Sequence, residues 1–331
     1  MHAPDRFAAL VAEEDLERLD TELVRAVSVD DPLLGEVATH LIVAGGKRLR
    51  PALTLAAASL GGRPAELSTL LGGVSIELVH LASLYHDDVM DEATRRRNVV
   101  SVNARWGNIV AIVAGDFLLA RSAEIAASLG TEIAALIAGT LGRLCQGQVA
   151  ELRAAFRVDR SEADYLAAIA DKTAALMSTA CRIGGITAGL DASLVDALTA
   201  YGEALGMVFQ VRDDVLDIVA SEEELGKEPG QDLAEGIYTL PVQRALADRE
   251  IGPILRPLLG RPLDRETMET ARGLVAASPG IAEAAFVARG YAAEAIDAAE
   301  RLGNGALQAG LADLVRSLLA DLERSTEALA S

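Results

Sequence analysis

The sequence predicts an all-α fold, and three observations support this. Apolar residues recur at helical spacing along the whole chain, and no run alternates with the period of two that marks a strand. Hydrophobic residues make up 51% of the 331 residues, whereas aromatic ones make up only 3%. Ala and Leu supply much of this apolar content, and both are strong helix formers. We therefore expect one helical domain, residues 1–331, built around small side chains.

The helices are expected to follow one another through short connections. With boundary errors of about 2–4 residues, they cover 5–28, 33–43, 50–60, 64–91, 100–128, 131–156, 161–188, 192–220, 237–248, 265–276, 280–303 and 307–329. Gly45 and Gly46 separate the second helix from the third, and Pro51 fits the first position of the third. Between 221 and 236 the periodic pattern gives way to Gly, Pro and acidic residues, which predicts a loop suited to act as a lid.

Charge and cysteine content exclude several classes of protein. The formal net charge is −19, so general binding to nucleic acid or to an anionic membrane surface is not expected. Cys145 and Cys181 have no metal-ligand spacing, which favours buried thiols in a reducing compartment, and hence a cytoplasmic location. The sequence carries no secretory signal and no uninterrupted apolar run of about 18 residues, so no transmembrane segment is expected.

Two near-identical acidic pentads, residues 87–91 and 213–217, dominate the sequence. Asp87 and Asp91 are four residues apart and share a helix face, as do Asp213 and Asp217. Like charges at this spacing cost a helix roughly 0.2–0.5 kcal/mol per pair, and few internal cations lie one turn away. An external cation would remove this repulsion. Oxygen ligands without Cys or His suit Mg²⁺, or alternatively Mn²⁺, bridging to phosphate.

Basic and polar groups near these pentads could hold the phosphate. GGKRLRP, residues 45–51, places three cations at a helix N-terminus, where free N–H groups favour an anion. His80 lies on the helix stripe that leads to Asp87, and Arg95-Arg96-Arg97 follows the first pentad. Each group also has a simpler interpretation. GGKRLRP could be a turn with solvated charges, His80 could be a core histidine, and the three arginines could compensate the charge of the nearby carboxylates. Lys172-Thr173 and Gln210 are weak signals when taken alone. Nucleophile and dinucleotide-binding motifs are absent from the sequence, which points to metal-assisted phosphate chemistry.

The order of these motifs resembles the trans-type polyprenyl diphosphate synthases, of the long-chain kind. The matching segments are GGKRLRP, LVHLASLYHDDVMDEATRRR, KT, FQVRDDVLD and TLP, which together span roughly residues 40–245. The resemblance implies an all-α bundle around a deep central cavity, of the class I isoprenoid synthase type, usually a homodimer. It also implies condensation of isopentenyl diphosphate onto an allylic diphosphate.

The resemblance further assigns roles to individual residues. Isopentenyl diphosphate would be held by Lys47, Arg50, His80 and Arg97, and the allylic diphosphate by Arg96, Lys172, Thr173, Gln210 and Lys227. Several Mg²⁺ ions would bind mainly to Asp87, Asp91, Asp213 and Asp217, with Asp88 and Asp214 in support. Two departures stand out: Ile237 replaces a Lys that often follows the lid, and Asn98 replaces a Gly after the arginines.

The resemblance also implies that product length depends on the residues one turn before Asp87. Short-chain members of the family tend to carry aromatics where this chain has Ala82 and Ser83, so a small pair predicts a long all-trans product. The alternative is that these residues are small because another helix packs closely there. We leave open a transient membrane contact for product release.

Other functions remain as alternatives at this stage. A geranylgeranyl diphosphate synthase would share all of the motifs. A class I terpene cyclase needs no second diphosphate site, and its usual aromatic pocket fits poorly with 3% aromatics. A non-catalytic synthase subunit would commonly have degraded acidic motifs, and a structural metal-binding protein would leave the basic groups unexplained.

Overall fold

A computed structural model describes residues 10–221, 223, 228–303 and 305–330 of the chain. The described chain groups into two compact units. Of the described residues, unit 1 contains 10–141, 176–199 and 305–307, and unit 2 contains 142–175, 200–221, 223, 228–303 and 308–330. The expectation of a single domain stays a prediction, because one domain can contain two such units.

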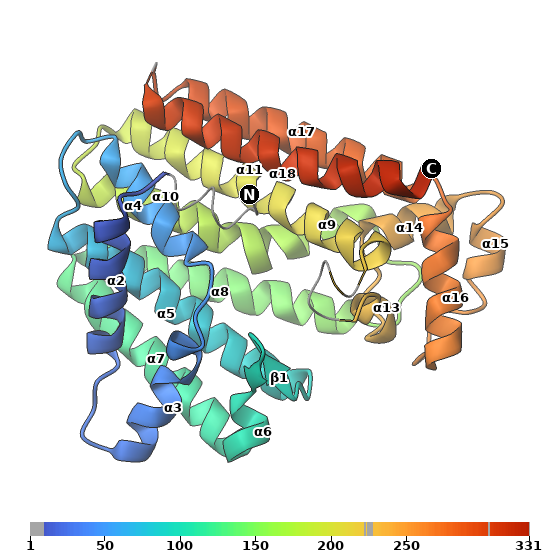
Figure 1. Ribbon diagram of the computed structural model, residues 1–331, viewed down its shortest axis with the longest axis horizontal. Helices are drawn as coiled ribbons and strands as arrows, with labels where there is room; N and C mark the ends of the chain where they lie inside the picture. Colours follow the sequence, from blue (N-terminus) through green and yellow to red (C-terminus); the bar gives the residue numbers. More distant parts are fainter. Residues whose placement is uncertain (1–9, 222, 224–227, 304, 331) are drawn as a thin grey trace. The chain divides into compact units, whose positions relative to one another are not determined.

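Unit 1 consists of helices and one short hairpin (Figure 1). Its elements are α2 (Glu13–Ala26), α3 (Pro32–Val43), α4 (Leu49–Ser59), α5 (Leu67–Met90), β1 (Arg95–Arg96), β2 (Val99–Val100), α6 (Val102–Trp106), α7 (Asn108–Ser128) and nearly all of α10 (Ala175–Thr187). The all-α prediction is confirmed.

Helix α5 is the core of unit 1. It packs along α7, and Gly115 permits the close approach, because a Cβ at that position would collide with the His86 ring. Among the described residues α5 is the one helix long and apolar enough to cross a membrane, but 67% of its most apolar window is buried inside the protein. Its place in the core therefore explains why α5 is long and apolar.

The structure corrects the prediction of one helix over 100–128 and of a chain without strands. Arg95 pairs with Val100 and Arg96 with Val99 in an antiparallel hairpin. Its two turn residues, Arg97 and Asn98, have φ values of 50° and 64°. Two left-handed residues in a row make a type I′ turn, which favours Asn or Gly. Asn98, the first departure from the expected family pattern, therefore suits its place in this turn. Gly107, at φ 90°, then separates α6 from α7.

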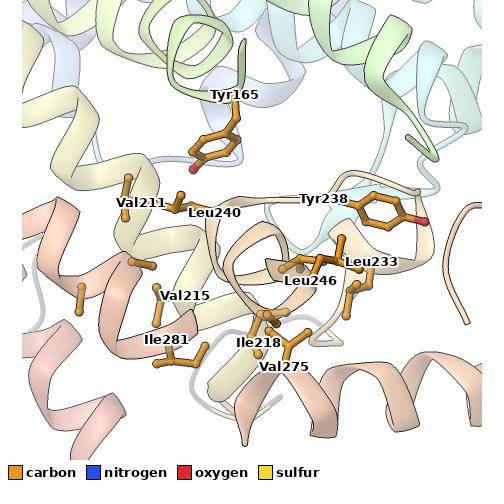
Figure 2. Close-up of a cluster of buried hydrophobic side chains, with 14 of the residues drawn as sticks. Tyr165, Val211, Val215, Ile218, Leu233, Tyr238, Leu240, Leu246, Val275 and Ile281 are labelled. Atoms are coloured by element: carbon orange, nitrogen blue, oxygen red, sulfur yellow. The ribbon is translucent and has the colours of Figure 1, made fainter. Parts of the chain in front are cut away.

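Unit 2 is also helical. Its elements are α9 (Glu162–Ile169), a π-helical turn η1 (Ala170–Ala174), α13 (Gln231–Ala234), α14 (Leu240–Ala247), α15 (Gly252–Leu255), α16 (Arg265–Ala276), α17 (Gly280–Glu300) and most of α8 (Thr131–Ala154), α11 (Ala192–Val219) and α18 (Ala306–Ala330). Figure 2 shows its apolar core, in which Val211, Val215 and Ile218 of α11 lie near Leu240 and Ile281.

The π-helical turn η1 interrupts the predicted helix over 161–188 at Lys172 and Thr173, and the structure divides that helix into α9, η1 and α10. Two glycines explain this interruption. A Cβ on Gly147 of α8 would lie 2.8 Å from Lys172 N, and one on Gly206 of α11 would lie 2.5 Å from Ala174 Cα. The backbone of η1 is thus wedged between two helices at positions without side chains. Such π-turns occur frequently at functional sites.

The predicted loop 221–236 contains the short helix α13, which the sequence analysis did not anticipate. Lys227 lies outside the described residues. Ile237, the second departure from the family pattern, donates from its backbone N–H to Asp232 O at 2.7 Å, so the chain leaves α13 through a tight turn.

Candidate functional site

The first acidic motif forms the C-terminal turn of α5 in unit 1. Asp88 is completely buried, accepts a hydrogen bond from Arg96 Nε at 2.7 Å and forms an ion pair with Arg96 Nη2 at 2.7 Å. Burial raises the pKa of Asp88, and the Arg96 charge opposes that shift. Asp87 is half-buried and Asp91 is exposed. The motif therefore combines an internal carboxylate that holds Arg96 with two outer carboxylates.

A cluster of cations lies further back along α5. It consists of Arg48, Arg50 and Arg97, with His80 beside them. They surround Glu77, a carboxylate that is only 2% exposed, and Arg48 Nη1 approaches Glu77 Oε1 to 3.5 Å. We call these five residues the buried basic cluster. The three guanidinium groups are opposed by two carboxylates, Glu77 and Asp20, and both of these contact Arg48. The cluster therefore carries excess positive charge inside a chain whose net charge is −19.

The local backbone shapes this cluster. Arg48 caps α4 with φ 45°, and its side chain also donates to Asp20 at 2.7 Å and to Ile42 O at 3.0 Å. The hairpin turn brings Arg97 to the carbonyls of Leu41, at 3.0 Å, and Gly45. Gly46 leaves room for this guanidinium, because a Cβ there would lie 2.7 Å from Arg97 Nη1.

Burial and mutual repulsion perturb the titration of the cluster. Burial lowers the pKa of Arg50 to about 10, and its Nε is a buried donor without a hydrogen-bond partner among the described residues. Burial, followed by repulsion from Arg50 and Arg97, holds the pKa of His80 well below its ordinary value, so its imidazole is neutral near pH 7. Burial raises the pKa of Glu77, although the arginines oppose this.

The predicted anion-binding residues of unit 1 thus have different surroundings. Arg50, His80 and Arg97 come together in the buried basic cluster. Arg96 instead lies against Asp88, and Lys47 is exposed. Arg95 is exposed and donates to Asn98 O at 2.7 Å, which stabilises the hairpin.

The second acidic motif lies near the end of α11 in unit 2. Asp213 has a side chain that is 44% exposed and receives a hydrogen bond from Arg212 at 2.9 Å. Asp217 is buried, and it accepts from the backbone N–H of Asp232, at the start of α13, at 3.3 Å. Asp214 is buried as well, and burial raises its pKa to about 7.

Neutral donors surround Asp214. Tyr165 of α9 donates its hydroxyl to Oδ2, and Gln210 Nε2 donates to Oδ1 at 2.8 Å. Thr173 of η1 donates to Gln210 Oε1 at 2.7 Å. Lys172, the residue before it, forms an ion pair with Glu151 of α8. The predicted residues Lys172, Thr173, Gln210 and Asp214 are therefore linked within one unit.

The donor set of both motifs fits a hard divalent cation. Among the residues that the structure describes, no three His, Cys, Asp or Glu side chains converge on one point as a closed metal site. Each motif instead combines buried carboxylates held by the protein with more accessible ones, such as Asp91 and Asp213. Open sites of this kind suit ions that keep water or phosphate oxygens among their ligands.

The residues expected to control product length also have distinct surroundings. Ala82 is completely buried in the apolar core of unit 1, together with Val102 and Ala111. Ser83 is half-buried and donates its hydroxyl to His80 O at 2.8 Å. Close packing is thus a sufficient reason for a small residue at 82, whereas the role of position 83 stays a prediction.

Sequence reasoning missed Glu77 and Tyr165. Glu77 could have been noticed as a lone carboxylate in an apolar helix, one turn before His80. Tyr165 lies seven residues before Lys172, a spacing that returns to the same face of a regular helix. Neither spacing reveals the partner of these residues. Glu77 pairs with Arg48, 77 − 48 = 29 residues away, and Tyr165 pairs with Asp214, 214 − 165 = 49 residues away.

Comparisons with known proteins agree with this arrangement. Residues 31–275 match the family model described as polyprenyl synthetase. The chain is 43% identical to a nonaprenyl diphosphate synthase of Mycobacterium tuberculosis over 281 residues, covering 84% of this chain and 82% of that protein.

Solved structures give the same result. A decaprenyl diphosphate synthase from Rhodobacter capsulatus has a TM-score of 0.89 at 34% identity, with 96% of this chain and 99% of that chain covered. A geranylgeranyl pyrophosphate synthase from Corynebacterium glutamicum, crystallised with calcium and isoprenyl diphosphate, has a TM-score of 0.83 at 36% identity, covering 93% and 95%.

Proposed function

The chain belongs to the polyprenyl synthetase family, and from this premise we propose that it makes a long all-trans polyprenyl diphosphate. It is a trans-prenyltransferase that joins isopentenyl diphosphate to an allylic diphosphate. The observation that carries the proposal is the buried basic cluster. Burying unpaired cations costs several kcal/mol per ion unless an anion compensates them, and a diphosphate supplies that compensation.

In this proposal each group of residues has a task. Arg50 and Arg97 bind the diphosphate of isopentenyl diphosphate, and the neutral His80 donates a hydrogen bond without adding charge. Lys172 and Thr173 bind the diphosphate of the allylic substrate. Glu77 and Asp88 hold the arginines in place rather than binding substrate.

We further propose Mg²⁺ as the physiological cation, with Asp87, Asp91, Asp213 and Asp217 as its principal ligands. Bound divalent ions neutralise charge that develops on a departing diphosphate. The chain supplies the carboxylates in two motifs, and Lys172 adds a positive charge. Calcium accompanies isoprenyl diphosphate in the Corynebacterium relative, which supports a divalent site next to a diphosphate.

A homodimer in the cytoplasm completes the proposal. Helix α7 exposes Ile109, Ile112 and Val113 on one face, and an exposed apolar stripe favours association. We expect sedimentation to give the mass of a dimer, and Ile112→Glu to shift it toward a monomer. Ile254→Glu, at an exposed apolar residue on α15, is the control.

Two observations favour a long product over geranylgeranyl diphosphate. The first is the small residue at position 83. The second is the 43% identity to a nonaprenyl diphosphate synthase over 281 residues, which is higher than the 38% identity to a short-chain isoprenyl diphosphate synthase of Methanothermobacter thermautotrophicus over 237 residues. A short-chain product, such as geranylgeranyl diphosphate, is therefore the alternative that the product assay must distinguish from a long-chain one.

The direct test is to incubate the purified chain with isopentenyl and farnesyl diphosphates and Mg²⁺ and to measure product length. Asp87→Ala and Asp213→Ala should abolish elongation while leaving the apo melting temperature nearly unchanged, because both carboxylates are partly solvated.

The matched control is Asp88→Ala, which removes the buried partner of Arg96 and should destabilise the apo protein by about 3–5 kcal/mol. Near-normal elongation by Asp87→Ala or Asp213→Ala would refute the proposed metal ligands. Products that stop at geranylgeranyl diphosphate would establish the short-chain alternative.

A further inference from the structure

Tyr165 has no role in the chemistry proposed so far, yet it is the most enclosed polar contact of the second acidic motif. Its side chain is 1% exposed and its hydroxyl donates to Asp214 Oδ2. Figure 2 shows the ring above Val211 and Leu240, with the hydroxyl directed toward α11. Arg160 also lies over the ring, with its Cζ 5.5 Å from the ring centre. The phenol is therefore fixed by apolar packing and by a cation.

The hydrogen bond of Tyr165 starts a continuous chain. Asp214 receives a second hydrogen bond from Gln210, and Gln210 receives one from Thr173, at 2.8 and 2.7 Å. This chain connects three elements of unit 2, namely α9, α11 and η1. Every side chain in it is neutral apart from the Asp214 carboxylate. We call these four residues the tyrosine relay.

Both ends of the tyrosine relay adjoin groups assigned to substrate and metal. Asp214 follows Asp213 directly, so its orientation constrains the turn of α11 that carries the metal-binding carboxylates. Thr173 follows Lys172 in a π-helical turn, whose carbonyls and amides are not held by regular helical pairing. A side-chain hydrogen bond from Thr173 to α11 can therefore decide how η1 presents both residues.

We propose that Tyr165 is a positioning residue that, through Asp214 and Gln210, aligns the second metal-binding motif with the Lys172–Thr173 pair. The inference rests on the proposed function and deepens it, because it assigns the alignment to the site of the allylic diphosphate. Tyr165 itself touches neither metal nor substrate. Partners that orient metal-binding groups in this way typically change metal affinity by about 10–100-fold when they are removed.

The test compares two buried tyrosines of unit 2. Tyr165→Phe removes one hydroxyl and keeps the ring. Tyr201→Phe is the matched control, since Tyr201 is equally buried on α11 but donates to the backbone carbonyl of Leu311 at 3.0 Å. Binding of Mn²⁺ in the presence of inorganic pyrophosphate is measured by electron paramagnetic resonance, which requires no turnover.

We expect Tyr165→Phe to weaken Mn²⁺–pyrophosphate binding by about 10-fold or more and to raise KM for the allylic substrate, with KM for isopentenyl diphosphate within about two-fold of wild type. Tyr201→Phe should leave all three unchanged. Thr173→Val removes a proposed diphosphate contact as well as one end of the relay, so the second arm is the double variant Tyr165→Phe/Thr173→Val. Its loss of Mn²⁺–pyrophosphate binding should not exceed that of Thr173→Val alone, because both substitutions break the same chain of hydrogen bonds.

Equal effects of Tyr165→Phe and Tyr201→Phe on Mn²⁺–pyrophosphate binding would overturn the inference, and so would losses from Tyr165→Phe and Thr173→Val that simply add in the double variant. Failure of the proposed function would look different: the wild-type chain would make no prenyl product, whereas the difference between the two tyrosine variants in metal binding would persist.

Discussion

Glycine 46 gives the sharpest test of a single residue in the buried basic cluster. A methyl group on Gly46 would lie 2.7–3.1 Å from the guanidinium atoms of Arg97, which must move away. Gly46→Ala should therefore raise KM for isopentenyl diphosphate by about 10-fold, the equivalent of about 1.4 kcal/mol of lost binding, with little change in KM for the allylic substrate.

Gly45→Ala is its control. Gly45 also has a positive φ, 86°, but a Cβ there has no neighbour within 4 Å. Both variants carry backbone strain, and only Gly46→Ala displaces Arg97. Identical kinetics for the two would show that Arg97 does not contribute to this binding.

The neutral His80 makes a prediction about pH. Above its ordinary pKa of 6.5 the folded and unfolded chains are both neutral at this residue. Below pH 6.5 the unfolded chain takes up a proton that buried His80 does not accept, so the free energy of unfolding falls. This group alone contributes a slope of at most about 1.4 kcal/mol per pH unit.

His80→Gln removes that contribution and keeps hydrogen-bonding groups at the position. Urea unfolding of the apo protein between pH 7.5 and 5 should show a smaller loss of stability for the variant than for wild type. Glu77 is present in both proteins, so its opposing titration largely cancels in the comparison. Parallel curves would mean that His80 is protonated in the folded state.

Residue identities could be predicted from the sequence far better than residue partners. The acidic pentads, Arg50, His80 and Lys172 stand out by type and spacing. That Asp88 faces inward to Arg96, and that Arg97 turns instead to the Gly45–Gly46 segment, depends on the hairpin turn at Arg97 and Asn98. A non-glycine pair with positive φ gives little signal in a chain of helical periodicity.

At the scale of elements, apolar periodicity predicted the long helices well and the interruptions poorly. Helices α5, α8, α11 and α17 fall within the expected ranges, give or take a few residues. The interruption at η1 was not predictable, because it arises from contacts with Gly147 and Gly206 on other helices. A helix pattern records which face is buried, but it does not record how closely the neighbouring backbone approaches.

Gly206→Ala tests this explanation of the π-helical turn. Its Cβ would lie 2.5 Å from Ala174 Cα, a backbone atom that cannot rotate away. We expect overpacking to cost about 1–3 kcal/mol of stability and KM for the allylic substrate to rise, because η1 carries Lys172 and Thr173. Urea unfolding and initial rates measure the two effects.

Gly290→Ala on α17 provides the comparison for Gly206→Ala. It is also a helical glycine, but a Cβ there meets nothing within 4 Å. Replacing glycine by alanine in an open helix position should stabilise the protein by about 0.5–1 kcal/mol. If Gly206→Ala also stabilised the protein, η1 would not be held by close packing against α11.

At the scale of the whole molecule, α5 joins structure and function. The same helix forms the core of unit 1, carries Glu77 and His80 of the buried basic cluster, and ends in the first acidic motif. Helix α5 is long and apolar because it forms the core of unit 1, where 67% of its most apolar window is buried. Glu77 and His80 lie within the helix and the acidic motif lies at its end, where we propose that a diphosphate and metal ions bind.

Product length is the property of the whole enzyme that α5 is expected to set. Ala82→Phe is a poor probe, because Ala82 is completely buried among Val102, Ala111 and other core residues, and an added ring should cost about 1–3 kcal/mol or more by overpacking. Ser83 is half-buried, and its hydroxyl only returns to His80 O. An aromatic ring fits there with less disturbance.

Ser83→Phe should therefore shorten the product while leaving the first condensations intact, because the ring would block the path of the growing chain one turn before Asp87. Chromatography of the dephosphorylated products measures the distribution. Ser68→Phe, at a half-buried serine near the start of the same helix, controls for the cost of an added ring on α5. An unchanged product from Ser83→Phe, or equal shortening by both variants, would place the length-limiting contact elsewhere than at position 83.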